Sequence, residues 1–251
     1  MKKLVIFTLA HVLLLANAPV LAAATESVCN ADSLGARYSI VVTHSNKDKK
    51  KISENTFSLW RNKNIVAHED GGKKITEIWH KLPNNFLTMT RYFDDYQRAV
   101  NYSPVDLNEG RGEKNWSVKS QIVADSLLAS MTLQETSGEG CLVKEKYVAT
   151  AGQPKRSIEW YPKLKLMASY VLQKNETSIV WTLEEIIQDP KQVAANIAQR
   201  NSYNDTDYAD IGDNESDPFF QKMINIGFIE HGSSGIYDVD GKEIGKGHHH
   251  H

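Results

Sequence analysis

The chain has 251 residues, with 29 Lys and Arg against 31 Asp and Glu and a formal net charge of −2 at pH 7. This balance argues against nucleic acid as a partner, because binding to phosphates needs a basic face. After the N-terminal leader no stretch is long and apolar enough to cross a bilayer, so we do not expect an integral membrane protein.

The first 24 residues have the pattern of a secretory signal peptide. Lys2 and Lys3 form a positive start, residues 4–15 are almost entirely apolar, and residues 22–24 are three alanines. Such a leader is removed on export. We therefore assign residues 1–24 to a signal peptide and expect a periplasmic protein.

Cys29 and Cys141 are the only cysteines. In an oxidising compartment an even pair most simply forms one disulfide, with two separate thiols as the alternative. Closing so long a loop stabilises a fold by roughly 4–5 kcal/mol in the chain-entropy model. We expect the bond to hold an irregular N-terminal arm, residues 25–36, against a central strand.

Between residues 38 and 107 short β-branched and aromatic segments alternate with turn residues, which is typical of antiparallel strands. The basic run 46–51 fits a solvated hairpin tip better than a phosphate site. The predicted strands cover 38–44, the two sides of a turn at 61–64, a segment around 75–79, and a hairpin over 84–107 that reverses at Asp94 and Asp95.

Residues 108–115 are polar and contain two glycines, which predicts a loop. The strand pattern is then interrupted over residues 119–131, where apolar residues recur at helical spacing, and it resumes at 140–150. The apolar positions of this short helix are Ile122, Val123, Leu127, Leu128 and Met131.

Residues 158–172 carry the clearest pattern, because every second residue is apolar over the whole length. One strand of about fifteen residues spans roughly 50 Å and must bend across a twisted sheet. Residues 173–177 then reverse the chain into a second strand, 178–186. The apolar face of this pair carries Trp160, Leu164, Leu166, Tyr170, Trp181 and Leu183.

After residue 188 the pattern indicates two helices, each opened by a proline behind a capping residue. Asp189 caps the first helix, and Ser216 or Asp217 caps the second. We expect the apolar face of the second helix either to dock on the sheet or to bind another envelope protein. That face is formed by Phe219, Phe220 and Met223.

These elements predict a mainly β protein, built as a curved antiparallel sheet or incomplete β-barrel with a short inserted helix and C-terminal helices. The β domain spans residues 25–188, and a helical and acidic extension spans residues 189–247. Residues 248–251 form a His tail that is either a purification tag or native.

The order of the elements, with the segment IEWYPKLKLMASY at residues 158–170, resembles the periplasmic lipoprotein-carrier superfamily typified by LolA, LolB and RseB. The resemblance covers residues 38–187 and implies an incomplete β-barrel whose concave apolar face takes up acyl chains. It also implies a functional arginine, for which Arg61 and Arg91 are the candidates. The amphipathic helix that opens the family has no counterpart in residues 25–37.

We find no catalytic or cofactor motif, so we predict a protein that is not an enzyme and that has no cofactor and no metal ligands. The sequence HGSSG at residues 231–235 does not have the spacing of a nucleophile elbow. The acids of residues 204–217 miss the EF-hand register, and an irregular calcium site there stays open.

The apolar face is either an ordinary covered core or a cavity filled by a hydrophobic ligand. Our leading hypothesis is a periplasmic binding protein for a hydrophobic small molecule or lipid, such as an acyl chain or a lipoprotein anchor. One alternative is an accessory protein that binds an envelope partner through its C-terminal region. Another is a metal-handling protein that uses the His tail and the acidic loop.

Overall fold

The structure is a computed structural model that describes residues 29–46, 49–107, 113–152, 154–214 and 216–229. Within them the chain forms twelve strands in one sheet. In chain order the strands are β1 (Ser33–Asn46), β2 (Lys49–Asn62), β3 (Ile65–Asp70), β4 (Ile75–Lys81), β5 (Leu87–Phe93), β6 (Arg98–Tyr102), β7 (Thr132–Ser137), β8 (Lys144–Val148), β9 (Lys155–Tyr161), β10 (Leu166–Lys174), β11 (Thr177–Ile187) and β12 (Asn204–Asp207).

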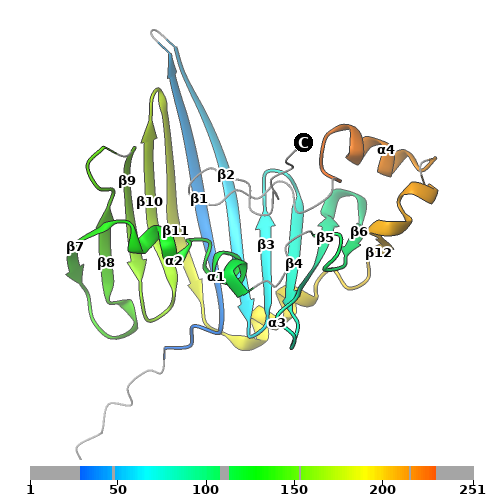
Figure 1. Cartoon of the computed structure of the whole chain (residues 1–251), viewed down its shortest axis with the longest axis horizontal. Helices are drawn as coiled ribbons and strands as arrows, with labels where there is room; N and C mark the ends of the chain where they lie inside the picture. The colour runs from blue at the N-terminus through cyan, green and yellow to red at the C-terminus, as the bar shows by residue number, and fades with distance from the viewer. Residues whose placement is uncertain (1–28, 47–48, 108–112, 153, 215, 230–251) are drawn as a thin grey trace, which may run out of the picture.

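Across the sheet the strands follow the order β12-β6-β5-β4-β3-β2-β1-β11-β10-β9-β8-β7. Neighbouring strands are antiparallel except for β12 and β6, which are parallel. Figure 1 shows a curved sheet whose two edges, β7 and β12, remain apart. The prediction of a mainly β protein with a curved, unclosed sheet is therefore confirmed.

The two faces of the sheet follow from the strand register, because residues directly opposite each other point to the same side. We call the front face the side that carries Leu59 of β2, His68 of β3 and Arg91 of β5. Leu59 lies opposite His68, and Glu77 of β4 lies between His68 and Arg91 in register. The back face carries the alternate residues, such as Trp60.

A first cluster of buried apolar side chains lies on the front face of β1, β2, β3, β9, β10 and β11. It is covered by α1 (Glu113–Gln121), α2 (Asp125–Ala129) and the residues around them. Ile122 and Val123, between the two helices, are completely buried in the cluster, and Leu127 and Leu128 of α2 pack against it. This connection between β6 and β7 is the inserted helical segment that the sequence predicts.

A second front cluster lies on β4, β5 and β6 and is covered by α4 (Pro218–Asn225). The Asp217 carboxylate accepts a hydrogen bond from the Phe219 N–H at 2.8 Å, which is the predicted cap. Gly227 has a φ of 73° and follows the helix as its stop. The first and second clusters therefore divide the front face between two separate covers.

The back face is covered by α3 (Pro190–Ala198), whose Val193 is buried against Trp60, Ala67 and Ile187. Asp189 caps this helix as predicted, and its carboxylate accepts from the Lys191 N–H at 2.9 Å. The described part of the C-terminal extension thus packs on the sheet with α3 behind it, β12 at one edge and α4 in front.

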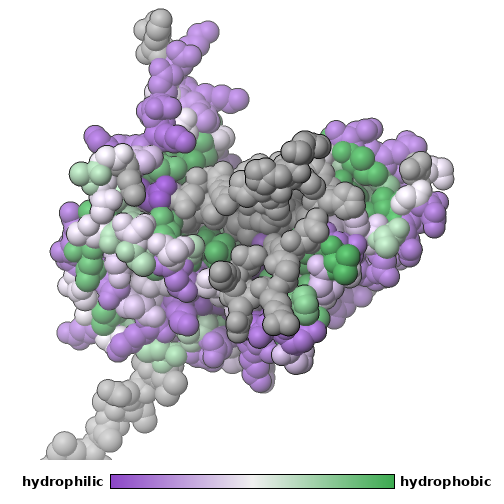
Figure 2. All heavy atoms as spheres, viewed as in Figure 1, coloured by the Kyte–Doolittle hydropathy of each residue, from purple (hydrophilic) through white to green (hydrophobic). Residues whose placement is uncertain are grey.

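The hairpin of β1 and β2 extends beyond its neighbours and forms a projecting ribbon. Asn46 lies opposite Lys49, so the basic run is a hairpin tip as predicted. Residues 49–55 of β2 pair with β1 alone among the described strands, because the pairing with β3 starts at Phe57. Figure 1 shows the ribbon rising above the other strands, and Figure 2 shows that its outer part is hydrophilic.

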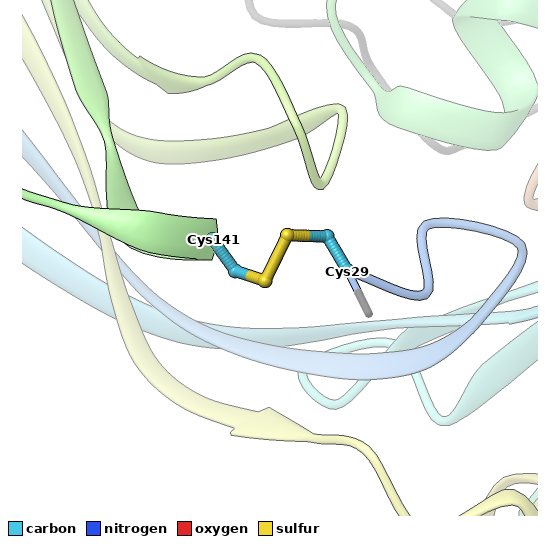
Figure 3. The surroundings of a disulfide bond; sticks show 2 residues. All are labelled: Cys29 and Cys141. Carbon is cyan, nitrogen blue, oxygen red and sulfur yellow. A yellow bond between two sulfur atoms is a disulfide. The ribbon is translucent and has the colours of Figure 1, made fainter. Parts of the chain in front are cut away.

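The predicted disulfide joins Cys29, just before β1, to Cys141 (Figure 3). Its expected attachment to a central strand is wrong, because Cys141 lies in the short turn between the edge strands β7 and β8. β1 lies in the middle of the sheet, and both cysteines pack against the first cluster. The sheet must therefore curl around this cluster, which makes the front face concave there.

The prediction of one long strand over 158–172 is wrong. The segment is a hairpin of β9 and β10, with Tyr161 opposite Leu166 and a four-residue turn between them. Lys165 in this turn has a left-handed φ of 47°. The turn places Met167 opposite Trp160, and a bulge between Met167 and Ser169 then shifts the register so that Tyr170 lies opposite Ile158. Leu164 within the turn is fully buried.

Other boundaries also differ from the prediction. β1 starts at Ser33, inside the expected irregular arm, and the single helix over 119–131 is two helices with Ile122 at φ 69° between them. β7 and β12 were not predicted. β7 is exposed along its whole length, and β12 is four mostly exposed residues whose backbone pairs with β6, so neither strand needs an apolar pattern.

Candidate functional site

The six residues predicted to face a ligand come together on the concave part of the sheet. Five of them are at most 6% exposed, and Leu183 is partly buried. All six belong to the first cluster or pack against it. Trp160 lies in β9, Leu164 in the following turn, Leu166 and Tyr170 in β10, and Trp181 and Leu183 in β11.

An aromatic group lies at the centre of the first cluster. The Trp181 ring centre lies 5.3 Å from that of Phe57 and 5.9 Å from that of Tyr38. The Tyr38 hydroxyl donates to the Met167 carbonyl at 3.0 Å, and burial raises the pKa of this hydroxyl. These contacts tie β1, β2, β10 and β11 together around a shared apolar surface.

The cover of this surface packs on it mainly through side chains. The backbone of α3 lies close against β1 and β2, whereas the described parts of α1 and α2 approach no strand as extensively. Large side chains fill the space between, including Trp116 of α1 and Leu127 and Leu128 of α2. A surface covered by a separate chain segment of this kind can exchange that cover for another apolar group.

A row of buried polar side chains crosses the front face beside the first cluster. We define this polar row as His68, Glu77 and Arg91, which are all fully buried. Arg91 donates to one Glu77 carboxylate oxygen from Nε at 2.9 Å and from Nη2 at 2.6 Å. Because each buried charge loses its hydration, such a pair survives only with close geometry and added hydrogen bonds.

The polar row also holds both front covers. His68 Nε2 lies 2.6 Å from the Lys119 carbonyl oxygen in α1. Arg91 Nη1 donates to the carbonyl of Phe228, just after the end of α4, at 2.7 Å. Lys119 Nζ lies 3.7 Å from the centre of the Trp79 ring. The two covers, which also share the second cluster through Trp116 of α1, therefore meet at the polar row.

His68 is neutral in the folded protein. Burial lowers its pKa to about 3, and the Lys119 carbonyl can only accept a hydrogen bond. The proton of the neutral ring must therefore lie on Nε2, which leaves Nδ1 as a bare acceptor.

Of the two candidate arginines, Arg61 supports the fold and Arg91 lies in the polar row. Arg61 donates to the carbonyl oxygens of Leu164 at 2.7 Å and Lys165 at 3.1 Å, which are in the β9–β10 turn. Burial lowers the pKa of Arg61 to about 10. Arg91 instead lies between the sheet and a cover segment, where a change of the cover alters its contacts.

The apolar face predicted for partner binding is docked on the sheet. Phe219, Phe220 and Met223 are buried in the second cluster. The Phe219 ring centre lies 5.1 Å from that of Phe93, and the Arg98 guanidinium lies over both phenylalanine rings. A protein partner would reach these side chains only if α4 left the sheet.

Three of the described acids of residues 204–217, Asp205, Asp207 and Asp217, accept hydrogen bonds from protein groups. Asp205 and Asp207 both accept hydrogen bonds from the Asn101 side chain. In the part of the chain that the structure describes, no three His, Cys, Asp or Glu side chains gather as metal ligands. The His tail 248–251 and the HGSSG segment lie outside the described residues.

A cavity of about 410 Å³ lies at the end of β5 and β6, away from the six predicted residues. Its lining is rich in hydroxyl, amide and carboxylate groups. They belong to Thr88, Thr90, Asn101, Ser103, Asp106 and Asp207, together with neighbouring apolar groups.

Sequence reasoning missed most of the polar row, although a signal was present. In β4 and β5 the residues Glu77 and Arg91 stand at the apolar phase of alternating strands, between Ile75 and Trp79 and between Met89 and Phe93. A charged residue at an inward position is costly and therefore informative. His68 is likewise fully buried at an inward position of β3.

No protein-family model matches the chain, and no curated protein sequence matches it. Similar solved structures include PNGF-II, at 14% identity and a TM-score of 0.33, where the match covers 68% of this chain and 31% of that one. A putative outer membrane lipoprotein-sorting protein domain from Vibrio parahaemolyticus has 7% identity and a TM-score of 0.29. That match covers 66% of this chain and 91% of the other. A LolA superfamily protein from Nitrosomonas europaea has 9% identity and a TM-score of 0.26. That match covers 65% of this chain and 90% of the other.

This chain thus spans about a third of PNGF-II and most of the two smaller proteins. Two of these structures are described as a lipoprotein-sorting domain and a LolA superfamily protein, and the sequence of residues 38–187 resembles that superfamily. None of the described helices combines the length and the apolar character needed to cross a membrane.

Proposed function

We propose that the protein is an exported, non-enzymatic binding protein that holds a hydrophobic ligand on the concave front face. The ligand is an acyl chain, carried either by a free lipid or by the anchor of a lipoprotein. The described arrangement is the closed form, in which α1 and α2 occupy the place of the ligand. Export to the periplasm follows from the predicted signal peptide, residues 1–24.

One observation carries the proposal: apolar side chains from six strands converge under a cover that packs on them through its side chains. Each buried methylene contributes about 0.8 kcal/mol, so an acyl chain gains much by entering this surface. The cover gives up comparable contacts when it leaves, because Ile122 and Val123 are fully buried in the cluster. Ligand and cover therefore compete for one surface, which favours reversible binding.

The first test is native mass spectrometry of the mature protein purified from cells without detergent. We expect an added mass that leaves as a lipid on activation. The second test adds the neutral apolar dye N-phenyl-1-naphthylamine to delipidated protein, where we expect saturable enhancement of its fluorescence.

A pair of matched variants locates the binding surface. Leu183 is partly buried at the first cluster, and Ile197 of α3 is partly buried on the back face. Leu183→Gln places a polar group on the ligand surface and should weaken dye binding by about tenfold, or roughly 1.4 kcal/mol. Ile197→Gln should leave dye binding unchanged. Equal effects of the two variants, or lipid-free protein that binds no dye, would contradict the proposal.

A further inference from the structure

Four buried polar atoms in and beside the polar row have no hydrogen-bond partner among the described residues. Each of their residues is at most 1% exposed. Buried polar atoms in folded proteins nearly always find a partner, so four in one neighbourhood need an explanation. The atoms are His68 Nδ1, Glu77 Oε2, Trp79 Nε1 and Tyr102 Oη.

The four residues are neighbours on the front face. His68 and Glu77 lie directly opposite each other on β3 and β4, and Trp79 is two residues further along β4 on the same side. Arg91, which binds Glu77, has its guanidinium carbon 5.4 Å from the centre of the Tyr102 ring. The four unpaired atoms therefore belong to one connected group around Arg91.

The unpaired atoms weaken the closed form, since each has lost its hydration without gaining a bond. An aromatic residue without a polar atom would avoid this cost at Trp79 and Tyr102. We infer that the polar row, with Trp79 and Tyr102, binds the polar head of the ligand. This inference rests on the proposed function.

The position of the group fits an acyl chain on the first cluster. His68 lies opposite Leu59 and Trp79 lies opposite Val66, and both apolar partners belong to that cluster. A chain that lies along the first cluster thus ends beside the polar row. Its head meets the unpaired atoms there.

The atoms select an uncharged head that both donates and accepts hydrogen bonds. Trp79 Nε1 donates, His68 Nδ1 and Glu77 Oε2 accept, and the Tyr102 hydroxyl does either. The positive charge of Arg91 is already matched by Glu77 at 2.6 Å, and the ammonium of Lys119 already lies over the Trp79 ring at 3.7 Å from its centre. A free carboxylate would face the Glu77 carboxylate and the bare His68 nitrogen, whereas an amide or a glycerol ester offers N–H or O–H groups together with a carbonyl.

The covers show how such a head is received. His68 Nε2 and Arg91 Nη1 now donate to the backbone carbonyls of Lys119 and Phe228. A ligand carbonyl replaces either of these acceptors when its cover moves away. Opening therefore exchanges a backbone carbonyl for a ligand carbonyl and supplies partners to the unpaired atoms.

The test uses the full mature protein and displacement of N-phenyl-1-naphthylamine by three sixteen-carbon competitors, palmitamide, monopalmitoylglycerol and palmitate. We expect the two uncharged lipids to bind at least tenfold more tightly than palmitate. Tyr102→Phe removes one unpaired oxygen, so it should reduce this preference at least threefold without lowering the melting temperature.

Tyr203→Phe is the matched control, because the Tyr203 hydroxyl is bonded to the Asp94 carboxylate at 3.3 Å and its ring packs on Tyr92, away from the first cluster and the polar row. It should lower the melting temperature and keep the lipid preference. Equal affinity for the three lipids, or an unchanged preference in Tyr102→Phe, overturns the inference while the proposed function stands. Absence of binding by dye and lipids alike overturns both.

Discussion

At the scale of single residues, the front face combines buried charges that have different partners. Arg61 satisfies two carbonyl oxygens of a turn, and Arg91 is paired with Glu77. His68 is buried without charge, because protonation would place an unpaired cation beside Lys119. The replacement of each group therefore has an effect of predictable sign.

His68 should make the stability depend on pH. Its pKa is about 3 in the folded protein and 6.5 in the unfolded chain. Below pH 6.5 the unfolded chain binds a proton that the folded state does not, so stability present above that pH is lost as the pH falls toward 3. As the pH falls through this range, the free energy of unfolding of the wild-type protein should decrease by about 1.4 kcal/mol per pH unit more than that of His68→Gln.

Urea unfolding of the two proteins between about pH 7 and pH 4 measures this difference. Gln keeps a side-chain N–H for the Lys119 carbonyl and does not titrate, so shared effects of the carboxylates cancel in the comparison. Parallel pH profiles would mean that His68 becomes protonated without cost.

Residue roles were only partly accessible from the sequence. Arg91 was one of two candidates because of the family resemblance, and the six apolar residues followed from alternation. The unpaired atoms of Trp79 and Tyr102 could not be predicted, since aromatic residues at inward positions are expected in any core. Their significance depends on which neighbours come within hydrogen-bonding distance, and that is a tertiary property.

At the scale of elements, the β9–β10 hairpin shows how a tight turn is held by a distant strand. Arg61 of β2 reaches the turn carbonyls of Leu164 and Lys165, about a hundred residues away in sequence. Leu164 is anchored below the turn in the first cluster. The hairpin therefore depends on both an apolar anchor and a charged donor.

Arg61→Met should destabilise the protein by roughly 2 kcal/mol, because two turn carbonyls lose their charged donor. Arg37→Met is the control in the adjacent strand, where Arg37 forms an exposed ion pair with Glu185 at 2.6 Å. Exposed pairs contribute about 0–1 kcal/mol, so this variant should be nearly neutral. Chemical denaturation measures the free energy of unfolding of both variants. Equal losses of this free energy would contradict the assigned role of Arg61.

Elements with local signals were predictable, and elements defined by distant pairing were not. Asp189 and Asp217 marked both C-terminal helices because capping is local in sequence. The phase of residues 158–172 identified the correct face, but the turn inside it left no break in the alternation. β12 has no apolar face, and only its backbone pairing with β6 makes it a strand.

At the scale of the whole molecule, the disulfide connects the middle of the sheet to one edge. Cys29 precedes the central strand β1, and Cys141 lies between β7 and β8. The other half of the sheet has no such link among the described residues and is held by α3 and α4. Removal of the bond should therefore affect the two halves unequally.

The double variant Cys29→Ser/Cys141→Ser should lose up to about 4–5 kcal/mol of stability, as expected for a loop of this length. Amide hydrogen exchange should rise most in β7 and β8, because these edge strands lose their attachment to the start of β1. It should rise least in β4 and β5. A uniform increase, or an increase centred on β4 and β5, would contradict a local role for the bond.

The overall class was predictable because strand alternation and turn residues repeat along the chain. The pairing of the cysteines was predictable from their number alone. The attachment of the sheet edge at β7 and β8 to the start of β1 could not be predicted, because it depends on strand order and curvature that no local segment contains.

The projecting ribbon leaves seven residues of β2, 49–55, with one row of backbone groups open to other molecules. Such a row is a template on which a further extended chain can add, and repeated addition leads to fibres. Lys49, Lys50 and Lys51 line that row, so a second copy of the same ribbon brings like charges against them. Electrostatic repulsion thus lets the molecule extend a long strand pair into solvent without polymerising along it.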